Sequence, residues 1–202
     1  MKKITIIDYG LGNLRSIKKS LEYAGANPLI SSNPDVISSS DGLILPGVGA
    51  FISAMKSIES FYDILNEFVK SGKPIFGICL GQQILMSESF EDGHTKGLDF
   101  IPGKVIRFPD NELKVPQIGW NSLNITQNHL IFEEIPNNSY VYFVHSYFVD
   151  ADISHTLATS DYGIDFAAAI VNDAGNVIGT QFHPEKSGAI GQRMIKNFIK
   201  MC

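Results

Sequence analysis

The chain has 202 residues, of which 44% are hydrophobic and 18% charged, and its net charge is −5. These values are typical of one globular domain, and they disfavour a basic nucleic-acid-binding protein or a polybasic membrane-surface segment. No apolar run approaches the length of a membrane span, and two cysteines do not make a disulfide framework. We therefore expect a cytoplasmic protein with no nucleic-acid or membrane partner.

Short apolar runs alternate with helical patterns in the first part of the chain. Buried strands are predicted over 4–7, 28–30, 42–46 and 73–78. Helices are predicted over 14–24, from 33 onward as a short segment, and from 51 to about 69. This alternation predicts a parallel sheet covered by helices on both faces. The pair Gly10 and Gly12 lacks the third glycine of a dinucleotide fingerprint, which disfavours a Rossmann site.

A cysteine stands between the fourth strand and a helix-like segment over 82–86. The sequence Gly77-Ile78-Cys79-Leu80-Gly81 has the Gly-x-Cys-x-Gly pattern, which is the cysteine form of the nucleophile elbow. Such a turn strains the nucleophile, and its glycines let neighbouring backbone pass without a Cβ clash. A helix N-terminus behind the sulfur favours the thiolate. The alternative is a small cysteine buried in a strand, and the pentapeptide alone leaves both interpretations open.

The second half of the chain is rich in strands. They are predicted over 100–108, 119–125, 140–149, 166–172 and 177–182. The turn over 173–176 joins the last two strands as a hairpin, and a final helix is expected over about 189–201. The predicted fold class is therefore α/β, a mostly parallel central sheet flanked by helices with an antiparallel extension in the second half.

His183 and Glu185 are candidates for the base that a cysteine nucleophile needs and for the group that orients this base. They stand two residues apart directly after a predicted strand, so extended backbone points both side chains to one face. Glu185 then accepts from one imidazole nitrogen while the other faces the thiol. Beside a cysteine elbow, this pair predicts catalysis by Cys79, His183 and Glu185. We expect His145, inside an apolar strand, to be structural.

An oxyanion hole needs two hydrogen-bond donors. We expect one from the backbone N–H of Leu80, the residue after the nucleophile. The other is expected from Val48 or Gly49, in a glycine-containing loop that follows an earlier strand. A plain strand-to-helix turn is the alternative for this loop.

Two of these motifs resemble those of the class I glutamine amidotransferases. The stretch 77–83 is similar to Gly-x-Cys-Leu-Gly-x-Gln in that family, and 182–185 is similar to its His-Pro-Glu. The resemblance implies a flavodoxin-like fold in which residues 1–202 form a single amidotransferase type 1 domain. It also implies hydrolysis of L-glutamine to glutamate and ammonia through a Cys79 thioester, without a metal or another cofactor.

Further stretches narrow the resemblance to the glutaminase subunits of imidazole glycerol phosphate synthase. They are 7–14, 45–51, 116–121, 143–147 and 181–187, in the expected order over nearly the whole chain. The resemblance implies a heterodimer with a TIM-barrel cyclase subunit. That subunit receives the ammonia and forms imidazole glycerol phosphate and aminoimidazole carboxamide ribotide in histidine biosynthesis. The chain departs from the family at Gln82, commonly Met, and at 117–118, commonly His-Met, where the family meets its partner.

The resemblance also assigns residues to the substrate and to the partner. The expected glutamine-binding residues are Gly47, Gly49, Gln83, Ser146 and Tyr147. The expected interface residues are Asn13, Arg15, Gln117 and Trp120. A helix N-cap is the alternative for Asn13, and a core position is the alternative for Trp120.

Two other functions remain open at this point. One is the glutaminase of another pathway, such as pyridoxal phosphate synthase, which the stretches 8–13 and 116–121 disfavour. The other is a non-catalytic glutamine-binding module on the same fold, which the intact set of Cys79, His183 and Glu185 disfavours.

Overall fold

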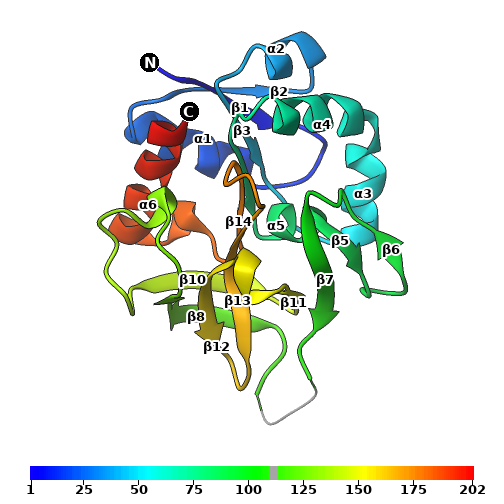
Figure 1. The fold of residues 1–202 in the computed structure, drawn as a ribbon, viewed down its shortest axis with the longest axis vertical. Coiled ribbons are helices and arrows are strands. Elements are labelled where there is room, and N and C mark those ends of the chain that lie inside the picture. The colour runs from blue at the N-terminus through cyan, green and yellow to red at the C-terminus, as the bar shows by residue number, and fades with distance from the viewer. Residues whose placement is uncertain (110–112) are drawn as a thin grey trace.

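The computed structural model describes residues 1–109 and 113–202, and in them a 12-stranded sheet runs through the centre of the molecule with helices on both faces (Figure 1). One half of the sheet is parallel. Its strands, in spatial order, are β2 (Asn27–Ser31), β1 (Lys3–Ile7), β3 (Gly42–Leu45), β4 (Ile75–Ile78) and β14 (Val177–Thr180). Every residue of β3, β4 and β14 is buried, because helices cover both faces. The predicted α/β class is confirmed.

The helices lie close to where the apolar spacing predicts them. They are α1 (Leu14–Tyr23), α2 (Pro34–Ser38), α3 (Phe51–Ile58), α4 (Tyr62–Lys70), α5 (Leu80–Ile84) and α6 (Gly188–Met201). Asn13 and Asn33 cap α1 and α2 with their side-chain oxygens. Two predictions need correction. A 3₁₀ turn over Glu59–Phe61 divides the helical region at 51–69, and the helix after Cys79 ends at Ile84. Met86 already belongs to strand β5 (Met86–Ser89), which the sequence analysis did not predict.

The chain from Met86 onward extends the same sheet, mostly with antiparallel pairs, and the antiparallel extension predicted for the second half is confirmed. The added strands are β13 (Asp165–Val171), β11 (Tyr147–Asp150), β7 (Ile101–Arg107), β5, β6 (Thr95–Lys96), β12 (Thr156–Asp161) and β9 (Asn124–Ile125). Strand β5 is the exception, since it runs parallel to β7. The predicted hairpin is confirmed, because β13 and β14 pair antiparallel across the turn at 173–176.

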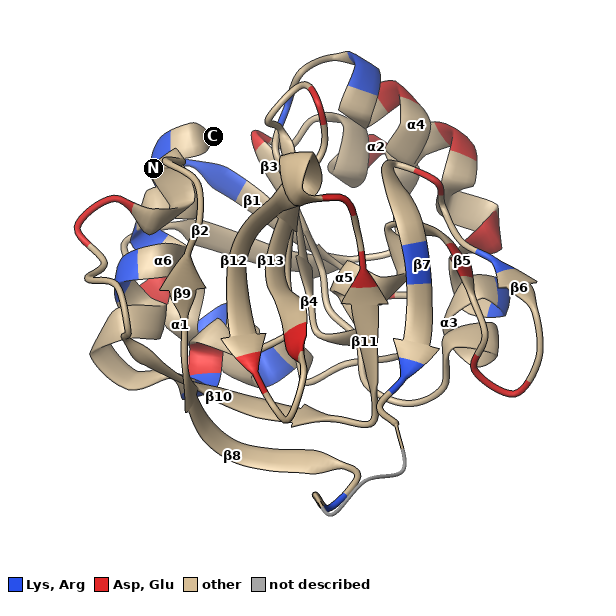
Figure 2. Ribbon diagram, turned by 60° about the horizontal axis from the view of Figure 1, so that its bottom comes forward, with Lys and Arg blue, Asp and Glu red and all other residues tan. Residues whose placement is uncertain are grey.

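Two strands leave the main sheet. β8 (Gln117–Ser122) and β10 (Tyr140–His145) form a separate antiparallel ribbon. The strand predicted over 140–149 is therefore two strands in different sheets, broken at Ser146, and the strand predicted over 119–125 divides into β8 and β9. Figure 2 shows that β8 carries no charged side chain along its length.

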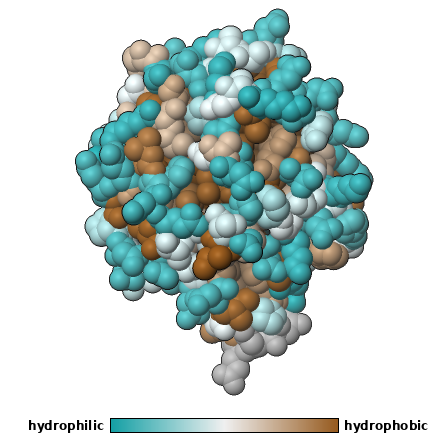
Figure 3. Space-filling model, viewed as in Figure 1, coloured by the Kyte–Doolittle hydropathy of each residue, from teal (hydrophilic) through white to brown (hydrophobic). Residues whose placement is uncertain are grey.

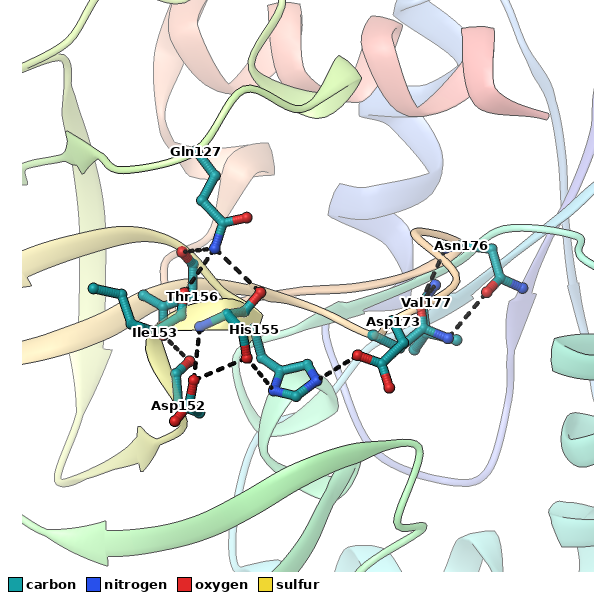
Figure 4. Close-up of polar contacts among 10 residues, drawn as sticks. Gln127, Asp152, Ile153, His155, Thr156, Asp173, Asn176 and Val177 are labelled. Carbon is teal, nitrogen blue, oxygen red and sulfur yellow. Dashed lines mark hydrogen bonds and ion pairs between the residues drawn. The ribbon is translucent and has the colours of Figure 1, made fainter.

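A set of polar contacts fixes the hairpin turn that leads from β13 into β14 (Figure 4). His155 Nε2 lies 3.0 Å from an Asp173 carboxylate oxygen, which ties the 3₁₀ turn before β12 to this hairpin. Asn176 donates to the carbonyls of Val69 and Lys73 at 2.9 and 3.1 Å. Gln127 donates to three backbone carbonyls over residues 153–156. The hairpin turn is thereby attached to the 3₁₀ turn before β12 and to the chain around Val69 and Lys73.

The surface shown in Figure 3 is mainly hydrophilic, with hydrophobic side chains in small patches between hydrophilic ones. Among the described residues, no helix combines the length and the apolar character needed to cross a membrane.

Candidate active site

Cys79 occupies a strained turn between β4 and α5. Its φ is 57° and its ψ is −111°, a backbone conformation that a non-glycine residue rarely adopts. The flanking glycines are needed because the turn is crowded. A Cβ at Gly81 would lie 1.9 Å from the Leu45 carbonyl oxygen, and one at Gly77 would lie 2.5 Å from the Gly81 oxygen. The turn therefore holds the sulfur at the carboxyl end of the sheet.

The sheet brings His183 beside Cys79, although 104 positions separate them in the sequence. Strands β4 and β14 are parallel neighbours, and the Cys79 N–H donates to the Thr180 carbonyl at 2.7 Å. His183 follows three residues later, and its own N–H donates to the Tyr142 carbonyl at 2.9 Å. Carboxyl ends of adjacent parallel strands meet at one edge, which is where α/β folds form their sites.

His183 pairs with Glu185 as the two-residue spacing predicts. Nδ1 of the imidazole lies 2.9 Å from Glu185 Oε1, and the Glu185 side chain is 1% exposed. His183 Nε2 is buried and has no hydrogen bond of good geometry among the described residues. Burial alone would lower the pKa of His183, but the sulfur of Cys79 and the carboxylate of Glu185 outweigh burial and raise it to about 9. At neutral pH the ring is therefore an imidazolium.

Cys79 and His183 border a cavity of about 270 Å³. All the predicted oxyanion and substrate residues except Gly47 line it, namely Val48, Gly49, Leu80, Gln83, Ser146 and Tyr147. Gly47 belongs to the same loop but packs closely against Leu80, since a Cβ there would come within 2.7 Å of Leu80 Cβ. A larger depression of about 690 Å³, at residues 125–137, has no cysteine or serine in its lining.

The residues expected to carry the oxyanion donors line this cavity. Leu80 is the first residue of α5, so its N–H has no acceptor within the helix. Gly49 has a φ of 105°, which only glycine adopts without strain, and Val48 beside it is 45% exposed. The buried Tyr9 phenol donates to the carbonyl of Pro46 and so fixes the start of this loop.

Glu91 is a residue of the cavity that the motifs did not reveal. Its carboxylate accepts from the Phe51 N–H at 2.7 Å, and burial, the dominant influence, raises its pKa. It lies in the loop between β5 and β6, outside any recognisable motif. Its place two residues after a strand end was the one available signal, and that signal is weak.

His145 lines the same cavity and has the structural contacts expected of it. Nδ1 lies 2.8 Å from the Tyr147 carbonyl oxygen, and Nε2 lies 2.9 Å from the terminal amide of Gln117, whose NH₂ group must face a neutral ring that donates through Nδ1. Burial lowers the pKa of His145 to about 4, although the hydrogen bond to Tyr147 opposes this shift. The ring is therefore neutral near pH 7 and donates through Nδ1. It supports the backbone of Tyr147 at the cavity wall.

The four predicted interface residues have different surroundings. Asn13 and Arg15 are exposed, and Asn13 also caps α1. Trp120 is 56% exposed with its ring edge against Tyr142, so a core position is wrong. Gln117 is 3% exposed and bonded to His145, so it offers no free side chain to a partner.

The neighbours of Trp120 were not singled out by the sequence analysis. Ile118 and Tyr140 are 64% and 62% exposed. In strand β8 the exposed residues 118 and 120 alternate with buried or half-buried positions. This alternation is typical of a strand that has one face toward a partner.

The arrangement is suited to acyl transfer. Cys79, His183 and the backbone of Leu80 and Gly49 border one cavity, and acyl transfer uses such a set of nucleophile, proton carrier and backbone amides. In residues 1–109 and 113–202, no group of three or more His, Cys, Asp or Glu side chains is placed to hold a metal ion.

Comparison with known proteins identifies relatives of this arrangement. The sequence model of the family Glutamine amidotransferase class-I matches residues 5–202. Imidazole glycerol phosphate synthase subunit HisH of Methanosarcina barkeri is 60% identical over 202 residues, which cover 100% of both chains. The protein of the same description from Geobacter sulfurreducens is 44% identical, again over 100% of both chains.

Solved structures share the fold at low sequence identity. A chain in the structure of PurLQS from Thermotoga maritima matches with a TM-score of 0.79 and 19% identity, covering 99% of both chains. A structure described as glutamine amidotransferase matches with a TM-score of 0.75 and 18% identity, covering 98% of this chain and 97% of the other. The chain therefore belongs to the class I glutamine amidotransferase family and, within it, to the imidazole glycerol phosphate synthase subunit HisH family.

Proposed function

We propose that this chain is the glutaminase subunit of imidazole glycerol phosphate synthase in histidine biosynthesis. It hydrolyses L-glutamine to glutamate and ammonia through a Cys79 thioester and delivers the ammonia to a cyclase subunit. The observation that carries the catalytic half is the strained Cys79 turn on a cavity shared with His183, whose imidazole is paired with Glu185. The relatives named HisH support the pathway and the partner.

Glutamine binds with its carboxamide next to the Cys79 sulfur and its amino-acid end toward the outer wall of the cavity. There Glu91 provides a carboxylate for the α-ammonium group. The loop with Gly47 and Gly49, the side chain of Gln83, and the backbone of Ser146 and Tyr147 complete the wall. Gln83 donates to the Tyr147 carbonyl at 3.0 Å, so one of its roles is to hold that backbone in place.

The first chemical step forms the thioester. The Cys79 thiolate attacks the carboxamide carbon, and the carbonyl oxygen becomes an oxyanion. The Leu80 N–H and the amide of Gly49 or Val48 stabilise it, and one such donor contributes roughly 3 kcal/mol in comparable sites. His183, charged at neutral pH because its pKa is about 9, gives a proton to the departing nitrogen. The carbon–nitrogen bond breaks and ammonia leaves.

The second step hydrolyses the thioester. His183, now neutral, takes a proton from water as the water oxygen attacks the thioester carbon. The carbon–sulfur bond breaks, glutamate leaves, and the thiolate–imidazolium pair is restored. Glu185 fixes the ring orientation through Nδ1 and stabilises its positive form in both steps.

The partner is a cyclase subunit with a TIM-barrel fold, in a one-to-one heterodimer located in the cytoplasm. The exposed side of the β8–β10 ribbon, with Trp120, is proposed as part of the contact, together with Asn13 and Arg15 at the start of α1. The central sheet includes strands from both halves of the chain, which supports treating residues 1–202 as one amidotransferase domain.

The test compares two nitrogen sources in the reconstituted complex. We expect Cys79→Ser to abolish glutamine-dependent formation of imidazole glycerol phosphate, while ammonia-dependent formation by the cyclase persists. Loss of both activities in a complex that still assembles would show that Cys79 is structural. Glutamine-dependent product at the wild-type rate would refute the proposed nucleophile.

A further inference from the structure

Gln181 is a buried amide that contacts the nucleophile and has no role in the scheme above. The residue is 0% exposed, and it follows β14 directly. Its Nε2 lies 3.7 Å from Cys79 Sγ, within the range for a hydrogen bond to sulfur. Its Oε1 lies 3.0 Å from Gln83 Nε2. The side chain therefore bridges the sulfur and the cavity wall.

A backbone carbonyl fixes the orientation of both amides. Gln83 Nε2 also lies 3.0 Å from the carbonyl oxygen of Tyr147, which can only accept a hydrogen bond. This end of Gln83 is therefore its NH₂ group, and the Gln181 atom facing it must be an acceptor. The NH₂ group of Gln181 is left pointing at Cys79. A flipped Gln181 amide would place two donors against each other and an oxygen against the sulfur.

We propose that Gln181 is a catalytic residue that donates a hydrogen bond to the Cys79 sulfur and stabilises its thiolate form. The inference rests on the proposed role of Cys79 as nucleophile. Val144 provides the contrast, since its carbonyl oxygen lies 3.9 Å from the same sulfur. That carbonyl accepts from a thiol S–H and repels a thiolate. The NH₂ group of Gln181 favours the thiolate over the thiol instead. Because this donor is neutral, it does not change the charge of His183.

The charged and titratable groups near the sulfur come from several elements. His183, with Glu185 behind it, follows β14, Tyr9 lies after β1, and His145 and Glu91 line the same cavity. A neutral substitution at Gln181 leaves all of them in place. A difference in the pH dependence of sulfur reactivity is therefore assigned to the lost donor.

The test measures alkylation of Cys79 by iodoacetamide in the full-length chain, with the modified residue located by peptide mapping. We expect Gln181→Met, which removes the donor at similar volume, to slow alkylation at pH 7 about tenfold, because a hydrogen bond to a charged group is lost. At pH 10, which lies above the ordinary pKa of a free cysteine, we expect the rate to stay within about twofold of wild type. Burial raises the pKa of Cys202 to about 12, so that thiol stays protonated over this range.

Gln82→Met is the matched control. Gln82 is also 0% exposed, and its side-chain amide donates to the Ala167 carbonyl at 3.4 Å and not to the sulfur of Cys79. We expect wild-type alkylation for this variant. Gln83→Met removes the donor that holds Oε1 of Gln181. We expect its alkylation rate at pH 7 to lie between the rates of Gln181→Met and Gln82→Met. This variant takes the place of Gln181→Met in the test if Gln181→Met does not fold.

Three results would overturn the assignment. They are a wild-type alkylation profile for folded Gln181→Met, an equal slowing by Gln82→Met, or a wild-type profile for Gln83→Met when Gln181→Met does not fold. Because iodoacetamide needs neither glutamine nor a partner, the assay is independent of the glutaminase assignment. A complex inactive with glutamine but with the expected alkylation profile would count against the proposed function and not against Gln181.

Discussion

Glu185 is one of two groups that raise the pKa of His183, beside the sulfur of Cys79, and its carboxylate oxygen lies 2.9 Å from the imidazole Nδ1. Glu185→Gln keeps an oxygen for Nδ1 but removes the negative charge. We expect the pKa of His183 to fall from about 9 and glutaminase activity in the complex to fall roughly 10²–10⁴-fold. Titration of the imidazole nitrogens by NMR measures the pKa. An unchanged pKa in the variant would show that the carboxylate is not its cause.

The raised pKa of His183 also makes the stability of the fold depend on pH. The pKa of His183 in the folded chain lies above the ordinary value of 6.5, so protonation stabilises the fold at pH values below 6.5. This contribution is lost as the pH rises through 9. Urea unfolding at pH 6 and pH 9.5 should show a smaller loss of stability in Glu185→Gln than in wild type. Equal losses in the two proteins would contradict the linkage.

The lowered pKa of His145 affects the pH dependence of stability in the opposite direction. Burial holds its pKa at about 4, so the unfolded chain takes up the proton first as the pH falls below 6.5. We expect the free energy of unfolding to decrease between pH 6.5 and 4, with roughly 3 kcal/mol of the decrease due to this ring. Urea titrations at pH 7.5 and 4.5 compare wild type with His145→Gln. The variant should lose less stability on acidification, and an equal loss would refute the assignment.

At the scale of single residues, motifs predicted the catalytic candidates and missed the residues that support them. Cys79 and His183 stand in short patterns whose spacing has a geometric meaning on a strand or turn. Glu91 and Gln181 reach the site through tertiary packing, and their distance from Cys79 in the sequence carries no such pattern. Gln117 shows the converse, since a position typical of an interface is occupied here by a buried side chain.

At the scale of elements, the turn at Cys79 depends on close approach between β3 and α5. A Cβ at Gly81 would overlap the carbonyl of Leu45, a backbone atom that cannot move without shifting β3. We expect Gly81→Ala to cost about 3 kcal/mol or more and to abolish activity. Gly175→Ala is the control. It has open space but a φ of 76°, and a cost of about 1–2 kcal/mol follows from its backbone strain. Denaturant unfolding measures both, and equal costs would contradict the crowding argument.

The order of elements was predictable where burial is complete, because strands covered on both faces become uninterrupted apolar runs, as in β3 and β4. It was not predictable where one apolar stretch serves two sheets. Residues 140–149 form such a stretch, and only the tertiary fold breaks it at Ser146. Strands β5 and β12 were missed because neither is a long apolar run.

At the scale of the whole molecule, the β8–β10 ribbon leaves a half-exposed tryptophan without a charged neighbour in either strand. Trp120 is the only tryptophan of the chain. We expect its emission to shift to shorter wavelength when the cyclase subunit binds, measured as a difference from Trp120→Phe. Trp120→Ala should weaken binding by about 2 kcal/mol, the scale of a central interface aromatic.

Ile153→Ala is the control for this surface, because Ile153 is 77% exposed and lies outside the ribbon. Its affinity for the cyclase should equal that of wild type. An unshifted emission of Trp120 in the assembled complex would place the cyclase on another face of the chain.

The central claim is that Cys79 attacks the carboxamide of glutamine. A diazo-ketone analogue of glutamine tests it most directly, with the adduct located by peptide mapping in the presence and absence of glutamine. The account predicts one adduct, on Cys79, whose formation glutamine slows by competition. An adduct on Cys202, or labelling of Cys79 that excess glutamine does not slow, would contradict it.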